Sequence, residues 1–276
     1  MSFFQKVWKE VAFFVGDVRG QSSFPYVTWS KHSHLVDYDE IMEVLPEIKY
    51  GDIGLHRDMH FLSNIFIPGF MKHSWIHTED GITSPKIVEA ISEGVVMRNP
   101  YYPLFSDFFI ILSPKNVTDE EREGACLKAN KIVGAEYGID FNFDIEEELA
   151  FYAGDDKGAA AHDLQCTQEN LCKYKFSFSC SEAVSYAWWH KREQLQLYRQ
   201  VRKGYNCILP DDFLNHGWEI KWLSKSVTVK AARDIGLHEE GIQMIAEYIE
   251  QNDTAGHLSE KDITAHDDAL APCESS

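Results

Sequence analysis

The apolar residues of this chain change repeatedly between helical and extended spacing, and these changes predict its elements. Helical spacing follows Cys180, where a helix is expected to run to about residue 198, and it recurs over 38–45, 119–133 and 240–250. Alternating or continuous apolar runs predict strands at 51–56, 72–78, 86–91, 94–98, 108–112 and 218–223. Ser92-Glu93-Gly94 supplies the turn of a hairpin, and Pro210 begins a short helical turn.

Changes in composition and hydrophobic pattern divide the chain into three parts. Residues 1–50 are interpreted as an N-terminal helical extension and 51–235 as the main domain. Residues 236–276 are interpreted as a C-terminal helix followed by a polar tail that is expected to be disordered. Within the main domain, residues 144–172 are acidic, rich in Gly and Ala and without a period, which indicates an insertion.

The composition is that of a globular protein, because 44% of the 276 residues are hydrophobic and 13% are aromatic. The net charge of −18 argues against non-specific nucleic-acid binding, which needs clustered Lys and Arg, so no nucleic-acid partner is expected. There is no apolar run of about 20 residues that would predict a transmembrane helix. The first 20 residues lack the features of a secretory signal, so we expect a cytoplasmic location, with release by lysis as the exception.

The N-terminal residues 3–15 form an amphipathic pattern. Phe4, Val7, Trp8, Val11, Phe14 and Val15 fall on one face of a helix. Such a face usually packs on its own domain. The alternative is peripheral contact with a lipid interface through residues 3–15.

Cys180 lies in Ser179-Cys180-Ser181-Glu182, which has the form of a capping box. Cys180 would then be the first residue of the helix, where the positive end of the helix dipole favours the thiolate and lowers the pKa of the thiol. The sequence therefore predicts an activated cysteine nucleophile. The alternative is a small buried residue that happens to begin a helix, since free Cys is among the most buried residue types.

Two further residues complete a candidate catalytic set. His73 opens the strand predicted at 72–78, which presents its imidazole at the end of a sheet. Glu89 is a lone acid among apolar residues on the next strand, and an acid in that setting needs a partner such as a histidine on the adjacent strand. Taken singly, His73 fits a structural histidine and Glu89 an outward-facing strand residue.

The six cysteines have no regular spacing and are expected to be reduced. Two sets of residues suggest metal sites, and neither site is expected. His162, Cys166 and Cys172 lack a CxxC pair. His56, His60, His73 and His77 have i, i+4 spacings, but on a strand His73 and His77 would lie more than ~10 Å apart. We expect no metal and no cofactor.

Several short motifs over residues 51–225 resemble, in type and order, those of the circularly permuted papain-like enzymes. These are the YiiX/YaeF-like relatives of the NlpC-type cysteine peptidases and of lecithin–retinol acyltransferase-like proteins. The motifs are Gly51-Asp52-Ile53, Gly69-Phe70-Met71-Lys72-His73, Ile87-Val88-Glu89-Ala90, Glu93-Gly94-Val95, Gly134-Ala135-Glu136-Tyr137-Gly138-Ile139-Asp140-Phe141 and Cys180-Ser181-Glu182-Ala183-Val184. The histidine strand precedes the cysteine helix, which resembles the permuted arrangement.

The resemblance implies an α+β fold with a papain-like core, in which a small antiparallel sheet packs on the nucleophile helix. It implies Cys180 as the nucleophile, His73 as general base and then acid, and Glu89 as the residue that orients His73. Three further residues are expected to line the substrate site: Tyr137, Trp75 and Ser181. Trp75 departs from the small residues usual after the histidine, and it is expected to narrow or reshape the cleft.

The resulting expectation is a cysteine hydrolase of amide bonds, a peptidase or amidase that acts on a peptide-like substrate. A lipid or thioester acyl hydrolase or acyltransferase on the same triad is the alternative, with an acyl substrate. A third reading is a non-catalytic binding module that keeps the fold.

Overall fold

The computed structural model describes residues 34–59, 67–79, 85–138, 177–198, 200–202 and 205–253, together with the strands β1 (Arg19–Gly20) and β2 (Val27–Thr28), which pair with each other. The predictions for residues 3–15, for the insertion at 144–172 and for the tail after 253 lie outside these residues. The same holds for the metal alternatives at His60, His162, Cys166 and Cys172.

One six-stranded sheet organises the described part of the chain. Its strands run in the order β12-β7-β3-β4-β5-β6, and every neighbouring pair is antiparallel. The strands are β3 (Ile53–Arg57), β4 (His73–Glu79), β5 (Lys86–Ile91), β6 (Gly94–Arg98), β7 (Phe108–Pro114) and β12 (Trp218–Leu223). All six predicted strands are confirmed, and the α+β class with them.

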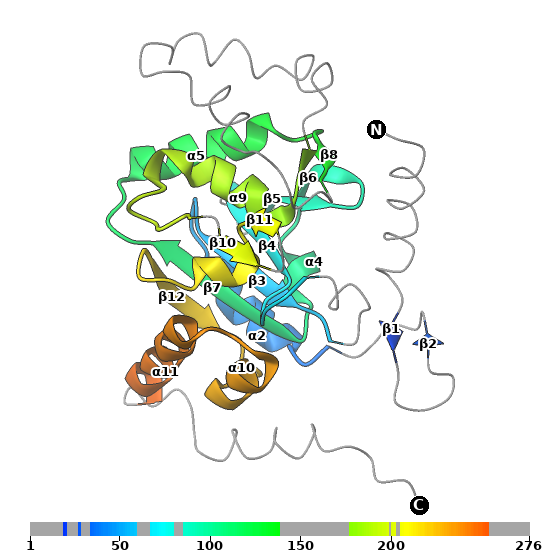
Figure 1. The fold of residues 1–276 in the computed structure, drawn as a ribbon, viewed down its shortest axis with the longest axis vertical. Coiled ribbons are helices and arrows are strands. Elements are labelled where there is room, and N and C mark those ends of the chain that lie inside the picture. The colour runs from blue at the N-terminus through cyan, green and yellow to red at the C-terminus, as the bar shows by residue number, and fades with distance from the viewer. Residues whose placement is uncertain are drawn as a thin grey trace, which may run out of the picture.

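Helices and shorter pairings surround this sheet (Figure 1). The α-helices are α2 (Tyr38–Val44), α4 (Tyr101–Leu104), α5 (Asp119–Lys131), α9 (Cys180–Trp188), α10 (Val229–Ile235) and α11 (Glu239–Asp253). The 3-10 turns are η1 (Leu45–Glu47), η2 (Trp189–Lys191) and η3 (Pro210–Phe213). The short strands pair as β8 (Glu136–Tyr137) with β9 (Ser177–Phe178), and β10 (Gln200–Arg202) with β11 (Tyr205–Cys207).

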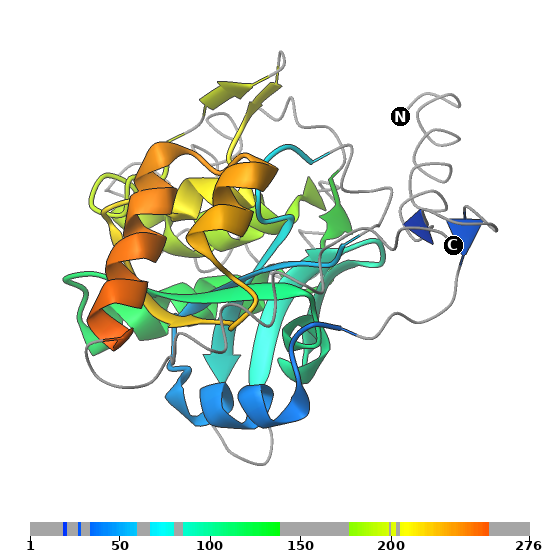
Figure 2. The ribbon, with the colours of Figure 1, turned by 90° about the horizontal axis from the view of Figure 1, so that it is seen from below.

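The sheet buries both of its faces, with α2 on one side and the longer helices on the other (Figure 2). On the face of α5 and α9, the strand residues Ile53, Leu55 and Ile76 pack against helical alanines such as Ala125 and Ala183. The small side chains let both helices lie close to the sheet. The helix that carries Cys180 is therefore fixed against the strand that carries His73.

The opposite face of the sheet packs against α2, which lies before residue 50. Ile41 and Val44 of α2 are fully buried in a cluster with Trp75, Phe109 and Ile111 of the sheet. An apolar sheet face has to be covered, and α2 covers this one, so it is part of the domain. Near the end of the described chain, α11 buries apolar residues in the same core cluster as Ile53 and Leu55, so the packing of the core also continues past residue 235.

The helix after Cys180 is shorter than predicted. It ends at Trp188 and passes into η2, whereas the sequence indicated a helix to about 198. Tertiary bonds explain the end: the Trp188 indole donates to the Gly51 carbonyl at 3.2 Å, and the Gln194 amide donates to the carbonyls of Lys115 and Asn116 at 2.7 Å.

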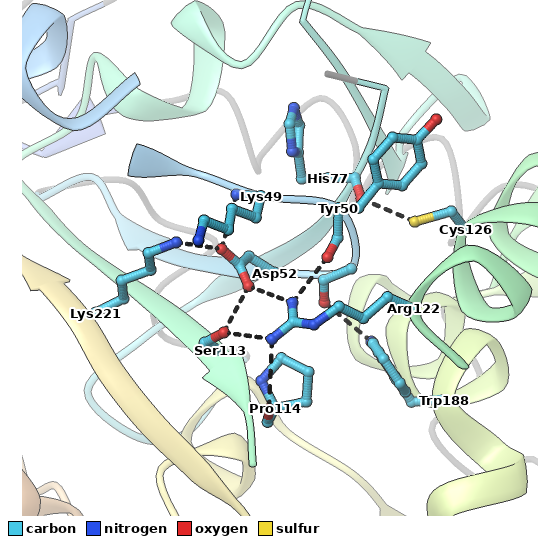
Figure 3. Close-up of polar contacts among 11 residues, drawn as sticks. Lys49, Tyr50, Asp52, His77, Ser113, Pro114, Arg122, Cys126, Trp188 and Lys221 are labelled. Atoms are coloured by element: carbon cyan, nitrogen blue, oxygen red, sulfur yellow. Dashed lines mark hydrogen bonds and ion pairs between the residues drawn. The ribbon is translucent and has the colours of Figure 1, made fainter. Parts of the chain in front are cut away.

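Asp52, at the turn before β3, forms a buried polar hub that binds side chains from three elements, α5, β7 and β12 (Figure 3). Its carboxylate is 0% exposed and accepts from Arg122 of α5 at 2.8 Å, Ser113 of β7 at 2.7 Å and Lys221 of β12 at 3.2 Å. The backbone N–H of Lys49 donates to the same carboxylate at 2.8 Å. The hub fixes the sheet and α5 relative to each other.

Candidate active site

Cys180 occupies the first position of α9, as the capping box predicted. The Ser179 hydroxyl accepts from the N–H of Glu182 at 3.4 Å, and the Glu182 carboxylate accepts from the N–H of Ser179 at 2.8 Å. Cys180 as a whole is 3% exposed. Burial alone suits a nucleophile and a structural cysteine equally, so the neighbours of the sulfur decide between them.

The sheet register brings His73 and Glu89 together. Glu89 pairs across the strands with Trp75, so His73, two residues earlier on β4, lies diagonally next to it on the same face. The Nε2 atom of His73 lies 2.9 Å from the Glu89 carboxylate. The His73 side chain is 17% exposed and that of Glu89 only 4%. Glu89 is therefore a buried acid whose partner is the histidine predicted from the sequence.

The His73 side chain also interacts with the Cys180 thiol, whose charge and hydrogen bonding are the largest influences that raise the pKa of His73. Since Nε2 of the imidazole faces Glu89, Nδ1 is left for the sulfur. His73 thus links Cys180, which lies 107 positions after it in the chain, with Glu89, which lies 16 positions after it.

The electrostatics of this line favour a thiolate–imidazolium pair. Burial acts to lower the pKa of His73, but the charge and hydrogen bond of Cys180, and then those of Glu89, raise it to about 10. Burial acts to raise the pKa of Cys180, but the charge and hydrogen bond of His73 lower it. Both directions favour the proton on the imidazole rather than on the sulfur. The thiolate is the nucleophilic form of cysteine.

Ser181 and the backbone of Ser74 also favour the thiolate. The Ser181 hydroxyl lies 3.8 Å from the sulfur, and both groups contribute hydrogen bonds that lower the pKa of Cys180. Ser181 was expected to line the substrate site. It is 2% exposed, and its hydroxyl is directed at the nucleophile.

Tyr137 lies close to the nucleophile through the pairing of β8 with β9. Tyr137 is the register partner of Phe178, two residues before Cys180. The pKa of the Tyr137 phenol is raised by burial and then by the negative charges of Cys180 and Glu182. Tyr137 therefore stays protonated near neutral pH.

Trp75 has the position of a core residue. It is 1% exposed and belongs to the cluster that α2 covers. Its indole crosses Gly54 of β3, where a Cβ atom in place of the glycine hydrogen would come within 2.0 Å of the ring. Because this glycine provides the space, the large side chain after the histidine is accommodated inside the fold.

Two neighbours of the triad were not identified as such from the sequence. His56 of β3 is the register partner of His73, with ring centroids 4.8 Å apart, and its pKa is well below the usual value because of burial and the charges of His73 and His34. Arg98 of β6 has its Nε atom 3.7 Å from the second oxygen of Glu89. The position of these two side chains beside the triad depends on the strand register, which cannot be read from the spacing of residues in the sequence.

Among the described residues, no group of three or more His, Cys, Asp or Glu side chains could hold a metal ion. His56 and His73 are adjacent, whereas His77 is buried four residues further along β4. Within the same part of the chain, no helix has the length and apolar character needed to cross a membrane. Comparisons with models of known protein families, with curated proteins and with solved structures found no match for this chain.

Proposed function

We propose that this protein is a cysteine-nucleophile hydrolase of amide bonds, a peptidase or amidase with a circularly permuted papain-like core. The observation that carries the proposal is the contact line of Cys180, His73 and Glu89, in which the pKa of the thiol is lowered and that of the imidazole is raised to about 10. A structural cysteine needs neither a helix N-terminus nor a histidine held by a buried acid.

The roles follow from the chemistry of the three groups. The Cys180 thiolate attacks the carbonyl carbon of the amide, and the backbone N–H groups at the start of α9 stabilise the oxyanion that forms. His73 gives its proton to the leaving amine, so that the C–N bond breaks and an acyl-enzyme remains. Neutral His73 then takes a proton from water as the water attacks the thioester, and the thiolate leaves. Glu89 keeps the imidazole oriented through both steps.

A lipid or thioester acyl hydrolase or acyltransferase on the same triad is the second candidate. It is favoured by exposed apolar side chains on α2, on α4 and directly after α4: Tyr38, Met42, Tyr102 and Phe105. Arg98 connects this group to the triad, because it contacts Glu89 and lies over the Tyr102 ring at 5.9 Å. Such a surface would suit the apolar part of a substrate.

The test is hydrolysis of a panel of peptide amides, acyl esters and acyl thioesters by the wild type, Cys180→Ala and Cys207→Ala. Cys207 is a matched control, since it is also a buried cysteine. Amide turnover lost only in Cys180→Ala supports the proposal, and turnover confined to esters or thioesters selects the acyl candidate. No turnover, with a Cys180 thiol that alkylates like an ordinary cysteine, refutes both and leaves a binding module.

A further inference from the structure

The loop that leads into the catalytic histidine is held by a buried carboxylate from a distant part of the chain. Asp211 of η3 is 2% exposed and uses both oxygens. The backbone N–H of Phe70 donates to Oδ2 and that of Met71 donates to Oδ1, each at 2.6 Å. Met71 lies two residues before His73, so the carboxylate fixes the backbone from which the imidazole extends.

Gly69 shows how closely the carboxylate approaches this loop. The residue has φ +102°, and a Cβ atom there would lie 2.2 Å from the Oδ2 atom of Asp211. Both the backbone angle and the space require glycine. The side chain of Asp211 therefore packs directly on the loop backbone.

The carbonyl side of the same loop is also bound. Arg57 of β3 donates through Nη1 to the carbonyls of Gly69 at 3.3 Å and Phe70 at 2.9 Å. The Lys72 ammonium donates to the Ile67 carbonyl. The backbone N–H groups of the loop thus bind Asp211, and its carbonyl groups bind Arg57 and Lys72. The positive charges of Arg57 and Lys72 balance the negative charge of Asp211.

The turn that carries Asp211 is itself anchored. Asp212 caps η3 by accepting from the N–H of Leu209 at 2.7 Å. The Nδ1 atom of His238 accepts from the N–H of Gly241 at 3.1 Å, so its Nε2 carries the proton and donates to the Asp211 carbonyl at 2.9 Å. The start of α11 is thereby connected to the histidine loop through η3.

We propose that Asp211 is a positioning residue for catalysis, which holds the loop 69–72 so that His73 meets Cys180 and Glu89 in the reactive geometry. This inference rests on the proposed function, because it assigns Asp211 a part in the activity of that site. A small displacement of a reacting group is enough to reduce turnover strongly, which is why a residue outside the reacting atoms matters.

The charge of Asp211 supports this role. Burial raises its pKa to about 6, against the opposing effect of the two backbone N–H groups and of His238 and Lys72. The charged or titratable groups that face it are Arg57, Lys72 and His238, and Asp107 also interacts with Arg57. When pH falls through about 6, Asp211 gains a proton and accepts less well from the two N–H groups, so the grip on the loop weakens.

The experiment compares Asp211→Asn with Asp212→Asn, a matched change on the same turn at a carboxylate that accepts from the N–H of Leu209 and not from the histidine loop. Two quantities are measured: the rate of iodoacetamide labelling at Cys180 against pH, and kcat and KM for the best substrate. We expect Asp211→Asn to lose the rapid labelling below pH 8 and to lower kcat by about 10²-fold, with a smaller change in KM. Asp212→Asn is expected to keep both. A folded Asp211→Asn with the labelling profile and kcat of the wild type overturns the inference.

If Asp211→Asn does not fold, Gly69→Ala and Gly236→Ala provide the same test. Both glycines have a positive φ, +102° and +99°, but a Cβ at Gly236 would meet no atom within 4 Å. Only Gly69→Ala pushes against Asp211, so only it is expected to lose rapid labelling, and equal profiles for the two variants overturn the inference. The labelling profile of the wild type distinguishes a failure of this inference from a failure of the proposed function. If Cys180 of the wild type labels like an ordinary cysteine, the proposed hydrolase itself is refuted.

Discussion

Glu89→Gln tests whether the buried acid stabilises the thiolate–imidazolium pair. The glutamine keeps the shape of the side chain but removes the negative charge 2.9 Å from Nε2 of His73. A hydrogen bond to a charged group contributes about 1.5–3 kcal/mol, and at 4% exposure little solvent replaces it. Divided by 1.36 kcal/mol for each factor of ten, this is a loss of roughly 10- to 150-fold in the population of the ion pair relative to the neutral pair.

The assay is mass-spectrometric labelling of Cys180 with iodoacetamide between pH 5 and 9. Wild type should label at a nearly constant rate from well below pH 8, whereas Glu89→Gln should label more slowly at pH 6 and approach the wild-type rate as pH rises. Glu79→Gln is the control, because Glu79 lies on the neighbouring strand in an exposed ion pair with Lys86. If Glu89→Gln and Glu79→Gln both reproduce the wild-type profile, Glu89 does not stabilise the pair and the argument from its burial is wrong.

Three further outcomes are expected. Amide hydrolysis should fall as pH rises through about 10, because His73 there loses the proton that the leaving amine needs while Cys180 remains a thiolate. The measurement is kcat against pH, with folding followed by fluorescence. A kcat that stays constant through pH 10 would contradict this role of His73. Asp52→Asn should lower the free energy of unfolding in urea by about 3–5 kcal/mol, because two cations lose a buried counter-charge, against at most ~0.5 kcal/mol for the exposed Asp234→Asn. Ser179→Ala should cost about 1 kcal/mol of stability in the same assay and slow labelling of Cys180; an unchanged urea midpoint would contradict the capping role.

Local signals carried most of the prediction of elements. The capping boxes at Thr118 and Ser179 mark the starts of α5 and α9 because each depends on side chains only three residues apart. The continuous apolar run of β7 predicted an internal strand, and β7 indeed lies between β3 and β12. Those residues are buried at every position, which already requires cover on both faces of the sheet.

What the sequence could not provide depends on contacts between distant residues. The cover from α2, the end of α9 at Trp188 and the grip of Asp211 on Phe70 each join residues that are tens of positions or more apart. The missed α10 has only seven residues, and its buried alanines give a weak periodic signal. Cys180, His73 and Glu89 were predicted from residue type and neighbouring strands, but His56 and Arg98 required the register.

The order of the elements of the candidate active site along the chain has a consequence during synthesis. The hairpin of β4 and β5, with His73 and Glu89, leaves the ribosome more than 90 residues before Cys180 does. Asp211 and β12, which complete the histidine loop and the outer edge of the sheet, are made later still. Domains are built from the N-terminus at about 5–20 residues per second, so the nascent thiol passes several seconds as an ordinary, weakly reactive cysteine. On the proposed function, the thiolate–imidazolium pair therefore forms only once the nascent chain has closed its core around Cys180, His73 and Glu89.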